Sequence, residues 1–572
     1  TKHQAPSTKH QAPSTKHQSP GTSHQSPVTH MSSPPDSPDL FPIRQRLLPA
    51  GSFLERRTIT SERWEQLQIE LLALGGPPID EWETAARLES LGYSDVLVQE
   101  QFGRESIFAL ARELFPDLIL GDDQPQPSRS EPTWQNSLKA DVVRFLRSLA
   151  YALPWLLLFF SERGVGLELS PERKLTPETA AAVSISIMLS LIVNGGFLQI
   201  MARRGLFYQG MKEPALERIF LVRVFRLGLL ISGIVACVGL LGGFYSNWLP
   251  DQALVLCAVH FGLLSVLWLS CGILTVCTPT PAIAGVFIIS VGVYLVLVLF
   301  TSVPVLTAQT ASIVVAGLST AWMARRALPS LNAQEPSAAF PDPVVLGYLL
   351  VPYFCVGCGY FAFLFTDRWL AGTVVAFGFG TPFVAHPEYQ LGIDLALLLF
   401  FLLVGFVEVC AFRFTQGIFE QAAQMDLLQG NFHKQVYTQY LRFLFGLASL
   451  VAIILILVWN LPESTWVLLT ASAAQAPIVR SIALLGTLSY GCLALALFQG
   501  LILFSFSQPS AVVWSLSWGL AINLLTSYFL SNLLGFEFTV CGVLCGAVIW
   551  MWVGIQSVHK LIRELEYSYF AM

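Results

Sequence analysis

Charged residues are scarce in this sequence. Asp, Glu, Lys and Arg make up 12% of the 572 residues, whereas hydrophobic residues make up 54%. Soluble domains carry about a quarter charged residues, so this composition excludes a chain that covers its whole surface with polar groups. The formal net charge is only −5, which gives no reason to expect a polyanionic partner. Most of the chain is therefore expected to lie in a membrane.

Signatures of enzyme and metal sites are also missing. The sequence contains no P-loop, no G-x-S-x-G, no H-E-x-x-H and no glycine-rich dinucleotide motif. His386 and His433 have no metal-ligand companion at a useful spacing. The first predicted outer loop, "ERGVGLELSPERKLTPE", lacks the Asp-x-Asp pattern that a membrane glycosyltransferase would use. We therefore expect no enzyme activity, no cofactor and no bound metal.

The ten cysteines do not form a disulfide framework. Nearly all of them lie in apolar runs, where a free cysteine behaves as a small hydrophobic residue. Cys355-Val-Gly-Cys358 resembles a redox pair, but thiols in an apolar helix are protonated and inert. The neighbouring Gly357 and Gly359 favour close helix packing instead.

The N-terminal quarter of the chain is polar. Residues 1–57 begin with a repeat of the type TKHQAPS, whose prolines forbid a continuous helix, so we expect a disordered low-complexity tail. Residues 58–120 show helical spacing and predict a small cytosolic module of three or four helices. Its acidic residues clearly outnumber the basic ones, which favours a docking or regulatory role and no nucleic-acid partner. Residues 121–140 are predicted to be a linker.

From residue 141 to 572 the chain predicts an all-α, polytopic membrane domain. Apolar runs of 18 or more residues recur, and each is long enough to cross about 30 Å of hydrocarbon. We predict about twelve spans, at 141–161, 178–201, 220–245, 253–276, 281–301, 304–323, 343–365, 391–413, 440–460, 481–505, 509–531 and 537–558.

The distribution of basic residues predicts the orientation. With the N-terminus inside, the predicted cytoplasmic connections carry Arg203, Arg204, Lys212, Arg218, Arg325, Arg326, Arg413, Lys434, Arg442, Lys560 and Arg563. The outer connections carry only Arg163, Arg173, Lys174, Arg368 and Arg480. This bias follows the positive-inside rule and predicts an inner (cytoplasmic) membrane protein with both termini cytoplasmic. The polar residues before the first span show no secretory signal.

One predicted span contains ionisable residues that are costly in hydrocarbon. Asp394 and Glu408 are fourteen residues apart, so they share one helix face about 21 Å apart. Two carboxylates on one face are accommodated most easily if that face lines a polar interior between helices. The alternative is that Glu408 forms a structural ion pair between helices and that Asp394 lies at the membrane interface. Arg413 lies about 140° round the helix from Glu408, which therefore needs a partner on another helix.

Two further pairs are candidates for a substrate pathway. Asp367 and Arg368 follow the seventh predicted span, where they either anchor the helix at the headgroups or line a cavity mouth. Arg223 and Arg226 share one face at the start of the third span. They are placed to meet anionic lipid headgroups, Glu408 or a passing sugar phosphate.

Three stretches together carry a resemblance to a known family. They are "NGGFLQIMARRGLFYQGMKEPAL", "VLGYLLVPYFCVGCGYFAFLFTDRW" and "PEYQLGIDLALLLFFLLVGFVEVCAFRFTQGIFEQAAQMDLLQG". With the ending "VHKLIRELEYSYF", they resemble the PelG-like exopolysaccharide transporters of the multidrug/oligosaccharidyl-lipid/polysaccharide flippase superfamily. The resemblance covers about residues 140–572.

The resemblance implies a fold and a function. It implies two six-helix bundles, at about 141–330 and 343–560, that export a polysaccharide by alternating access. The implied partners are the polysaccharide, membrane lipids, a cytosolic glycosyltransferase and membrane scaffold proteins. Asp367, Arg368, Glu408 and Arg413 match the family's polar pattern. Two alternatives stay open: a small-molecule or drug antiporter of the same superfamily, and a non-transporting scaffold or receptor that works through the N-terminal module.

Overall fold

The structure is a computed structural model. It describes residues 64–72 except 65, residue 78, residues 81–120, 134–150, 176–329 except 212, 248 and 279, 343–376, residue 383, and residues 386–424, 432–470 and 474–564. The predicted tail 1–57 lies outside the described residues. The chain divides into two compact units between Glu131 and Pro132. Each unit is described by itself.

The N-terminal unit is a small helical module. It contains helical residues 66–72 followed by α2 (Glu81–Ser90), α3 (Asp95–Phe102) and α4 (Ile107–Leu120). Apolar residues at helical spacing form its core, among them Leu71, Leu88 and Leu110, which are fully buried.

The second unit begins with α5 (Trp134–Ala150) and continues with long helices. These are α7 (Pro177–Gly210), α8 (Pro214–Ser246), α9 (Asp251–Cys277), α10 (Thr280–Phe300), α11 (Val305–Ala327), α12 (Pro343–Ala376), α13 (Pro387–Gln424), α14 (Phe432–Trp459), α16 (Ala476–Ser505), α17 (Pro509–Leu534) and α18 (Thr539–Arg563). Short α15 (Glu463–Thr470) and the 3₁₀ turn η2 (Phe536–Phe538) complete the described elements.

The predicted all-α membrane fold is confirmed. Eleven helices among the described residues are long and apolar enough to cross a membrane, and no described residue lies in a strand. They correspond to the second to twelfth predicted spans. The first predicted span, 141–161, falls only partly within the described residues, as the second half of α5.

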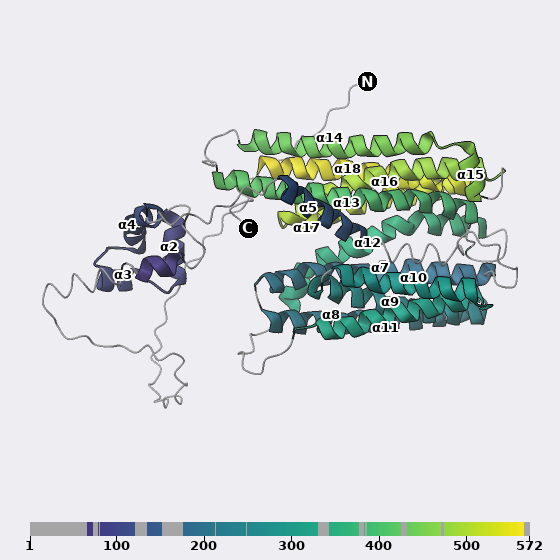
Figure 1. The fold of residues 1–572 in the computed structure, drawn as a ribbon, viewed down its shortest axis with the longest axis horizontal. Coiled ribbons are helices and arrows are strands. Elements are labelled where there is room, and N and C mark those ends of the chain that lie inside the picture. The colour runs from purple at the N-terminus through teal and green to yellow at the C-terminus, as the bar shows by residue number, and fades with distance from the viewer. Residues whose placement is uncertain are drawn as a thin grey trace, which may run out of the picture. The chain divides into compact units, whose positions relative to one another are not determined.

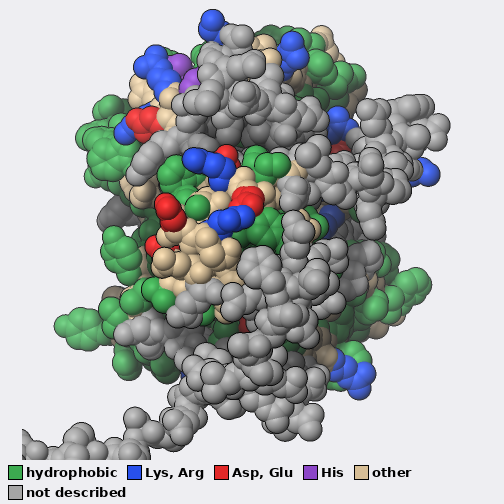
Figure 2. Space-filling model, turned by 90° about the vertical axis from the view of Figure 1, so that its left-hand side faces the viewer, with side chains coloured by type: hydrophobic (Ala, Val, Ile, Leu, Met, Phe, Trp, Pro, Cys, Tyr) green, Lys and Arg blue, Asp and Glu red, His purple; other side chains and the backbone are tan. Residues whose placement is uncertain are grey.

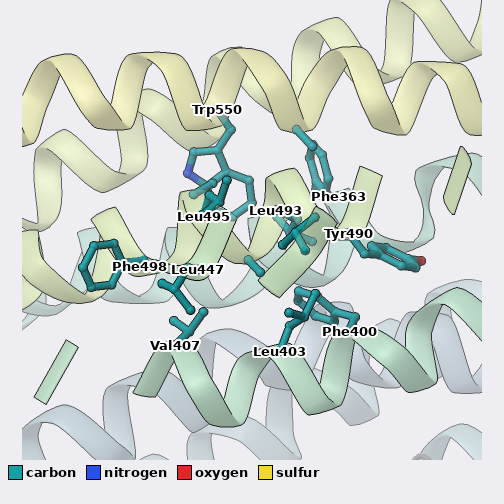
Figure 3. Packing of buried hydrophobic residues seen from close by; sticks show 14 of the residues in the cluster. Phe363, Phe400, Leu403, Val407, Leu447, Tyr490, Leu493, Leu495, Phe498 and Trp550 are labelled. Atoms are coloured by element: carbon teal, nitrogen blue, oxygen red, sulfur yellow. The ribbon is translucent and has the colours of Figure 1, made fainter. Parts of the chain in front are cut away.

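The long helices form two bundles (Figure 1). One core joins α7 to α11, with Leu346 and Leu350 of α12 packed against it. The other core joins α12 to α18, and Figure 3 shows Leu493 of α16 between Phe400 and Leu403 of α13 and Trp550 of α18. α12 runs between the two bundles and contacts α7 of the first and α17 of the second. Its two faces therefore join the bundles.

One end of the bundles is rich in basic side chains. Figure 2 looks at the end where α13 finishes and α14 begins, and Lys and Arg side chains are spread around its rim. These are the connections that the positive-inside rule predicts to be cytoplasmic.

Several helices extend beyond their predicted spans, and two of these differences concern residues of interest. α12 continues to Ala376, eleven residues beyond the predicted end at 365, because the apolar sequence WLAGTVVA extends the helix. Asp367 and Arg368 therefore lie inside α12 instead of following it. α5 starts at Trp134, within the segment predicted to be linker, and packs against α13 and α10.

Candidate functional site

A central cavity of about 440 Å³ lies between the two bundles. Its walls come from α7, α9 and α10 on one side and from α12, α16, α17 and α18 on the other. Gln199, Thr275 and Tyr360 contribute amide and hydroxyl groups, and most of the other lining residues are apolar. The large apolar residues in the wall are Leu191, Leu198, Trp268, Ile283, Phe287, Val356, Phe361, Leu497, Leu501, Phe504, Val512 and Trp550. Small-molecule sites have this size, about 300–1,000 Å³, and this mostly apolar lining.

Glycines let the two bundles approach closely beside the cavity. A Cβ atom added to Gly357 of α12 would lie 2.3 Å from the carbonyl oxygen of Gly195 of α7. A Cβ atom added to Gly195 would lie 2.4 Å from the ring of Phe361. Small residues at helix crossings permit such backbone contact in membranes. The α7–α12 crossing therefore forms a tight seam on one side of the cavity.

A buried polar network holds the walls of the first bundle. The Asn194 amide of α7 donates to Ser265 Oγ of α9 at 3.0 Å and accepts from Ser232 Oγ of α8 at 3.1 Å. Trp268, which lines the cavity, donates its Nε1–H to Ser190 Oγ at 3.2 Å. These bonds connect three helices and fix the indole of Trp268 at the cavity wall.

The second bundle contains a cluster of buried charges between α12, α13 and α16. Arg368 donates from Nη2 to Asp394 Oδ1 at 2.5 Å, and the two side chains are 8% and 15% exposed. Asp367 is fully buried and accepts a hydrogen bond from the Tyr389 hydroxyl at 2.8 Å. The fully buried Tyr490 of α16 lies near Arg368, Asp367 and Asp394. Counted over the described residues, the cluster contains one cationic side chain, Arg368, and two carboxyl side chains, Asp367 and Asp394.

The charged cluster and the cavity lie at different depths. Tyr360 lines the cavity, and Arg368 lies eight residues further along α12, or about 12 Å along the axis. None of the seven predicted pathway residues is among the described residues that line the cavity. A role of Asp367, Arg368 and Asp394 in a substrate pathway stays a prediction, and their observed contacts join α12 to α13.

Glu408 and Arg413 lie on the part of α13 that faces α5. Arg413 forms an ion pair with Asp141 of α5, and the Arg144 guanidinium lies 3.2 Å above the ring of Phe412. Glu408 is half-buried and has no hydrogen bond or ion pair with the described residues. The partner on another helix that the sequence predicts for Glu408 is therefore not found in the described part of the chain.

Arg223 and Arg226 are both exposed on α8. Arg223 lines a second hollow between α7, α8 and α12, whereas Arg226 does not. Both therefore lie away from the central cavity.

Sequence reasoning missed Asp141, Tyr389, Tyr490 and Asn194. Asp141 could have been recognised in the sequence, because it is an acidic residue close to the basic residues Lys139, Arg144 and Arg147. Asn194 and Tyr490 lie in largely apolar segments and Tyr389 lies at the start of α13, and in each case spacing alone does not indicate the partner. Among the described residues, no group of three or more His, Cys, Asp and Glu side chains is arranged to hold a metal ion.

Comparison with solved structures shows what the architecture is similar to. A point mutant of a MATE protein aligns with a TM-score of 0.53 at 12% identity, over 75% of this chain and 97% of that chain. A point mutant of the Vibrio cholerae MATE transporter VcmN aligns with a TM-score of 0.51 at 13% identity, over 76% and 99% of the two chains. An outward-facing multidrug resistance MATE family transporter of the MOP superfamily gives 0.51 at 14% identity, over 75% and 96%.

No protein-family model matches the sequence, and no curated protein matches it. The structural likeness therefore identifies the fold: a polytopic membrane protein with the two helical bundles of MATE-type transporters. A closer relationship to the PelG-like branch stays a prediction.

Proposed function

We propose that this protein is a membrane transporter that carries a small, largely apolar molecule through the central cavity. The observation that carries the proposal is the cavity itself, which is lined by both bundles and mostly by apolar and aromatic side chains. A site between two bundles is exposed to one side of the membrane or to the other when the bundles rock about their seam. The proposal requires no covalent step.

The lining favours an aromatic or amphiphilic substrate over a sugar polymer. Trp268, Tyr360, Phe361 and Trp550 offer ring faces and edges, whereas Gln199 and Thr275 provide only two other hydrogen-bonding side chains. Sugar hydroxyls lost from water need hydrogen-bond partners, and each unsatisfied polar group costs about 1–3 kcal/mol. A drug or drug-like cargo is accordingly the first candidate, in an inner membrane with both termini cytoplasmic.

Polysaccharide export is the second candidate. It is supported by the sequence resemblance to PelG-like transporters over about residues 140–572. In this case a polymer would pass between the bundles beside a cytosolic glycosyltransferase and membrane scaffold proteins. It predicts that loss of the protein lowers secreted polymer without changing the accumulation of lipophilic dyes.

A cavity-filling substitution tests the first candidate. Ala202 of α7 lines the cavity, so Ala202→Trp should occupy the space and abolish efflux of lipophilic dyes from loaded cells or proteoliposomes. Ala452→Trp places the same side chain at an exposed position of α14 and should leave efflux near the wild-type rate. Equal efflux by both variants and the wild type would rule out transport through this cavity.

The two candidates are separated by measuring both cargoes. Secreted polysaccharide and dye accumulation are assayed in a deletion strain that is complemented with the wild type, Ala202→Trp or Ala452→Trp. If the small-molecule proposal is correct, Ala202→Trp should lose dye efflux and leave secreted polysaccharide unchanged. If Ala202→Trp instead lowers secreted polysaccharide and leaves dye efflux unchanged, polysaccharide export becomes the supported function.

A further inference from the structure

A second hollow, here named the lateral groove, lies between α7, α8 and α12 and has a volume of about 450 Å³. It opens to the surface of the bundles, because its lining residues Leu227 and Val351 are 49% and 55% exposed. Of the described residues that line this groove, only Arg223 has a polar side chain. The groove is therefore an apolar channel with a single cationic group.

Two phenylalanines separate the lateral groove from the central cavity. The rings of Phe197 and Phe354 pack edge to face with their centroids 5.1 Å apart. Both residues line the groove and neither lines the cavity. A Cβ atom added to Gly196 would lie 2.4 Å from the Phe354 ring, so this contact is tightly packed. The groove is a site of its own.

The groove has the length of one membrane leaflet. Its lining on α8 runs from Phe220 to Ile231, about 16 Å along the helix, which is close to half of the roughly 30 Å hydrocarbon core. Arg223 lies one turn from Phe220, near the start of α8, and its long stem lets the guanidinium reach the headgroup level. The positive-inside prediction makes this the cytoplasmic leaflet.

We propose that the lateral groove binds one anionic phospholipid of the cytoplasmic leaflet. Its acyl chain lies along the apolar wall formed by α7, α8 and α12, and its phosphate contacts Arg223. Charge and shape agree on this occupant: the cation stands at the headgroup end of a groove that is otherwise apolar and is the length of one leaflet. The site does not depend on which molecule the protein transports.

The headgroup contact is tested by lipid retention. Full-length protein in detergent is mixed with phosphatidylglycerol and phosphatidylcholine of matched chains, and retained lipids are counted by native mass spectrometry. One arginine near a membrane surface corresponds to a change of about fivefold in the binding of anionic lipid. Arg223→Gln should therefore lower retained phosphatidylglycerol about fivefold. Arg226→Gln removes an exposed arginine of the same helix that does not line the groove, and it should leave retention unchanged.

The groove itself is tested by filling it. Gly347 of α12 lines the groove, and a Cβ atom added there meets no heavy atom within 4 Å. Gly347→Trp should therefore enter the groove without disturbing the fold and abolish retention of both lipids. Gly233 of α8 is equally open but does not line the groove, so Gly233→Trp serves as the matched control.

Circular dichroism and gel filtration check that each variant keeps the wild-type fold. The proposal is overturned if Gly347→Trp retains both lipids like Gly233→Trp, or if Arg223→Gln keeps the wild-type preference for phosphatidylglycerol. A loss that is equal in Arg223→Gln and Arg226→Gln would also overturn it, because it would indicate a diffuse charge effect.

Discussion

Replacing Arg368 with leucine is expected to destabilise the second bundle more than replacing its partner Asp394 with asparagine. Among the described residues, Arg368 is the cation of a cluster that also contains Asp394 and the fully buried Asp367. Arg368→Leu removes the counter-charge that Arg368 supplies to these two buried carboxylates. Asp394→Asn keeps a hydrogen-bond acceptor for Arg368 and leaves the guanidinium beside Asp367.

The expected magnitudes follow from burial. Breaking a buried ion pair by removing one partner costs about 3–5 kcal/mol, and the side chains here are only 8% and 15% exposed. We expect a loss of this size for Arg368→Leu and about 1 kcal/mol for Asp394→Asn. Because a pair replaced by apolar residues is often near neutral, the double variant Arg368→Leu/Asp394→Leu should recover about 2 kcal/mol or more of the loss.

The free energy of unfolding is measured by denaturant titration in micelles, with helical circular dichroism as the signal. Arg226→Leu is the matched control, since Arg226 is exposed on α8 and its loss should change stability by no more than about 0.5 kcal/mol. The reasoning is refuted if Arg368→Leu is as stable as Arg226→Leu, or if the double variant is less stable than Arg368→Leu.

Three further outcomes are expected. Gly357→Ala should cost about 1–3 kcal/mol of stability in the same titration, because its Cβ would lie 2.3 Å from the Gly195 carbonyl oxygen, whereas Gly347→Ala should be neutral or stabilising. Asp141→Asn should cost less than about 1 kcal/mol because its partner Arg413 is 45% exposed, and a larger loss would show that α5 depends on this pair. Burial lowers the pKa of His386, which precedes α13, against the opposing effect of Glu388 and Glu537. The free energy of unfolding should therefore fall as pH drops from about 6.5 towards this lowered pKa, because the unfolded chain takes up the proton first. In His386→Phe this part of the pH dependence should disappear. A pH profile equal to that of the wild type would contradict the assignment to His386.

The charged cluster illustrates what single residues reveal before the fold is known. Asp367, Arg368 and Asp394 were recognisable as candidates because ionised groups in apolar segments are costly. The pairing was not recognisable, since Arg368 and Asp394 lie on different helices 26 positions apart. Tyr389, which donates to Asp367, is an ordinary tyrosine in sequence and has a role only because α13 packs beside α12.

The residues that line the central cavity, in contrast, could not be recognised from the sequence. In a soluble helix the buried face is marked by apolar residues at a period of 3.6, but a membrane helix is apolar towards lipid and towards its neighbours alike. Leu198, Ile283 and Leu501 therefore look no different in sequence from residues that face lipid, although all three line the cavity. Periodicity carries no information about the cavity wall for this physical reason.

The sequence by itself determined that this is an all-α membrane protein, where most of its spans lie and which residues in them carry charge. Length and hydropathy suffice for these features because a helix rises by about 1.5 Å per residue and an unpaired charge is penalised in hydrocarbon. Only the tertiary structure decided which apolar faces enclose the cavity, that Arg368 pairs with Asp394, and that Arg223 lines a groove. These depend on how each helix is rotated and on which helices meet, and both are fixed by packing between residues far apart in the chain.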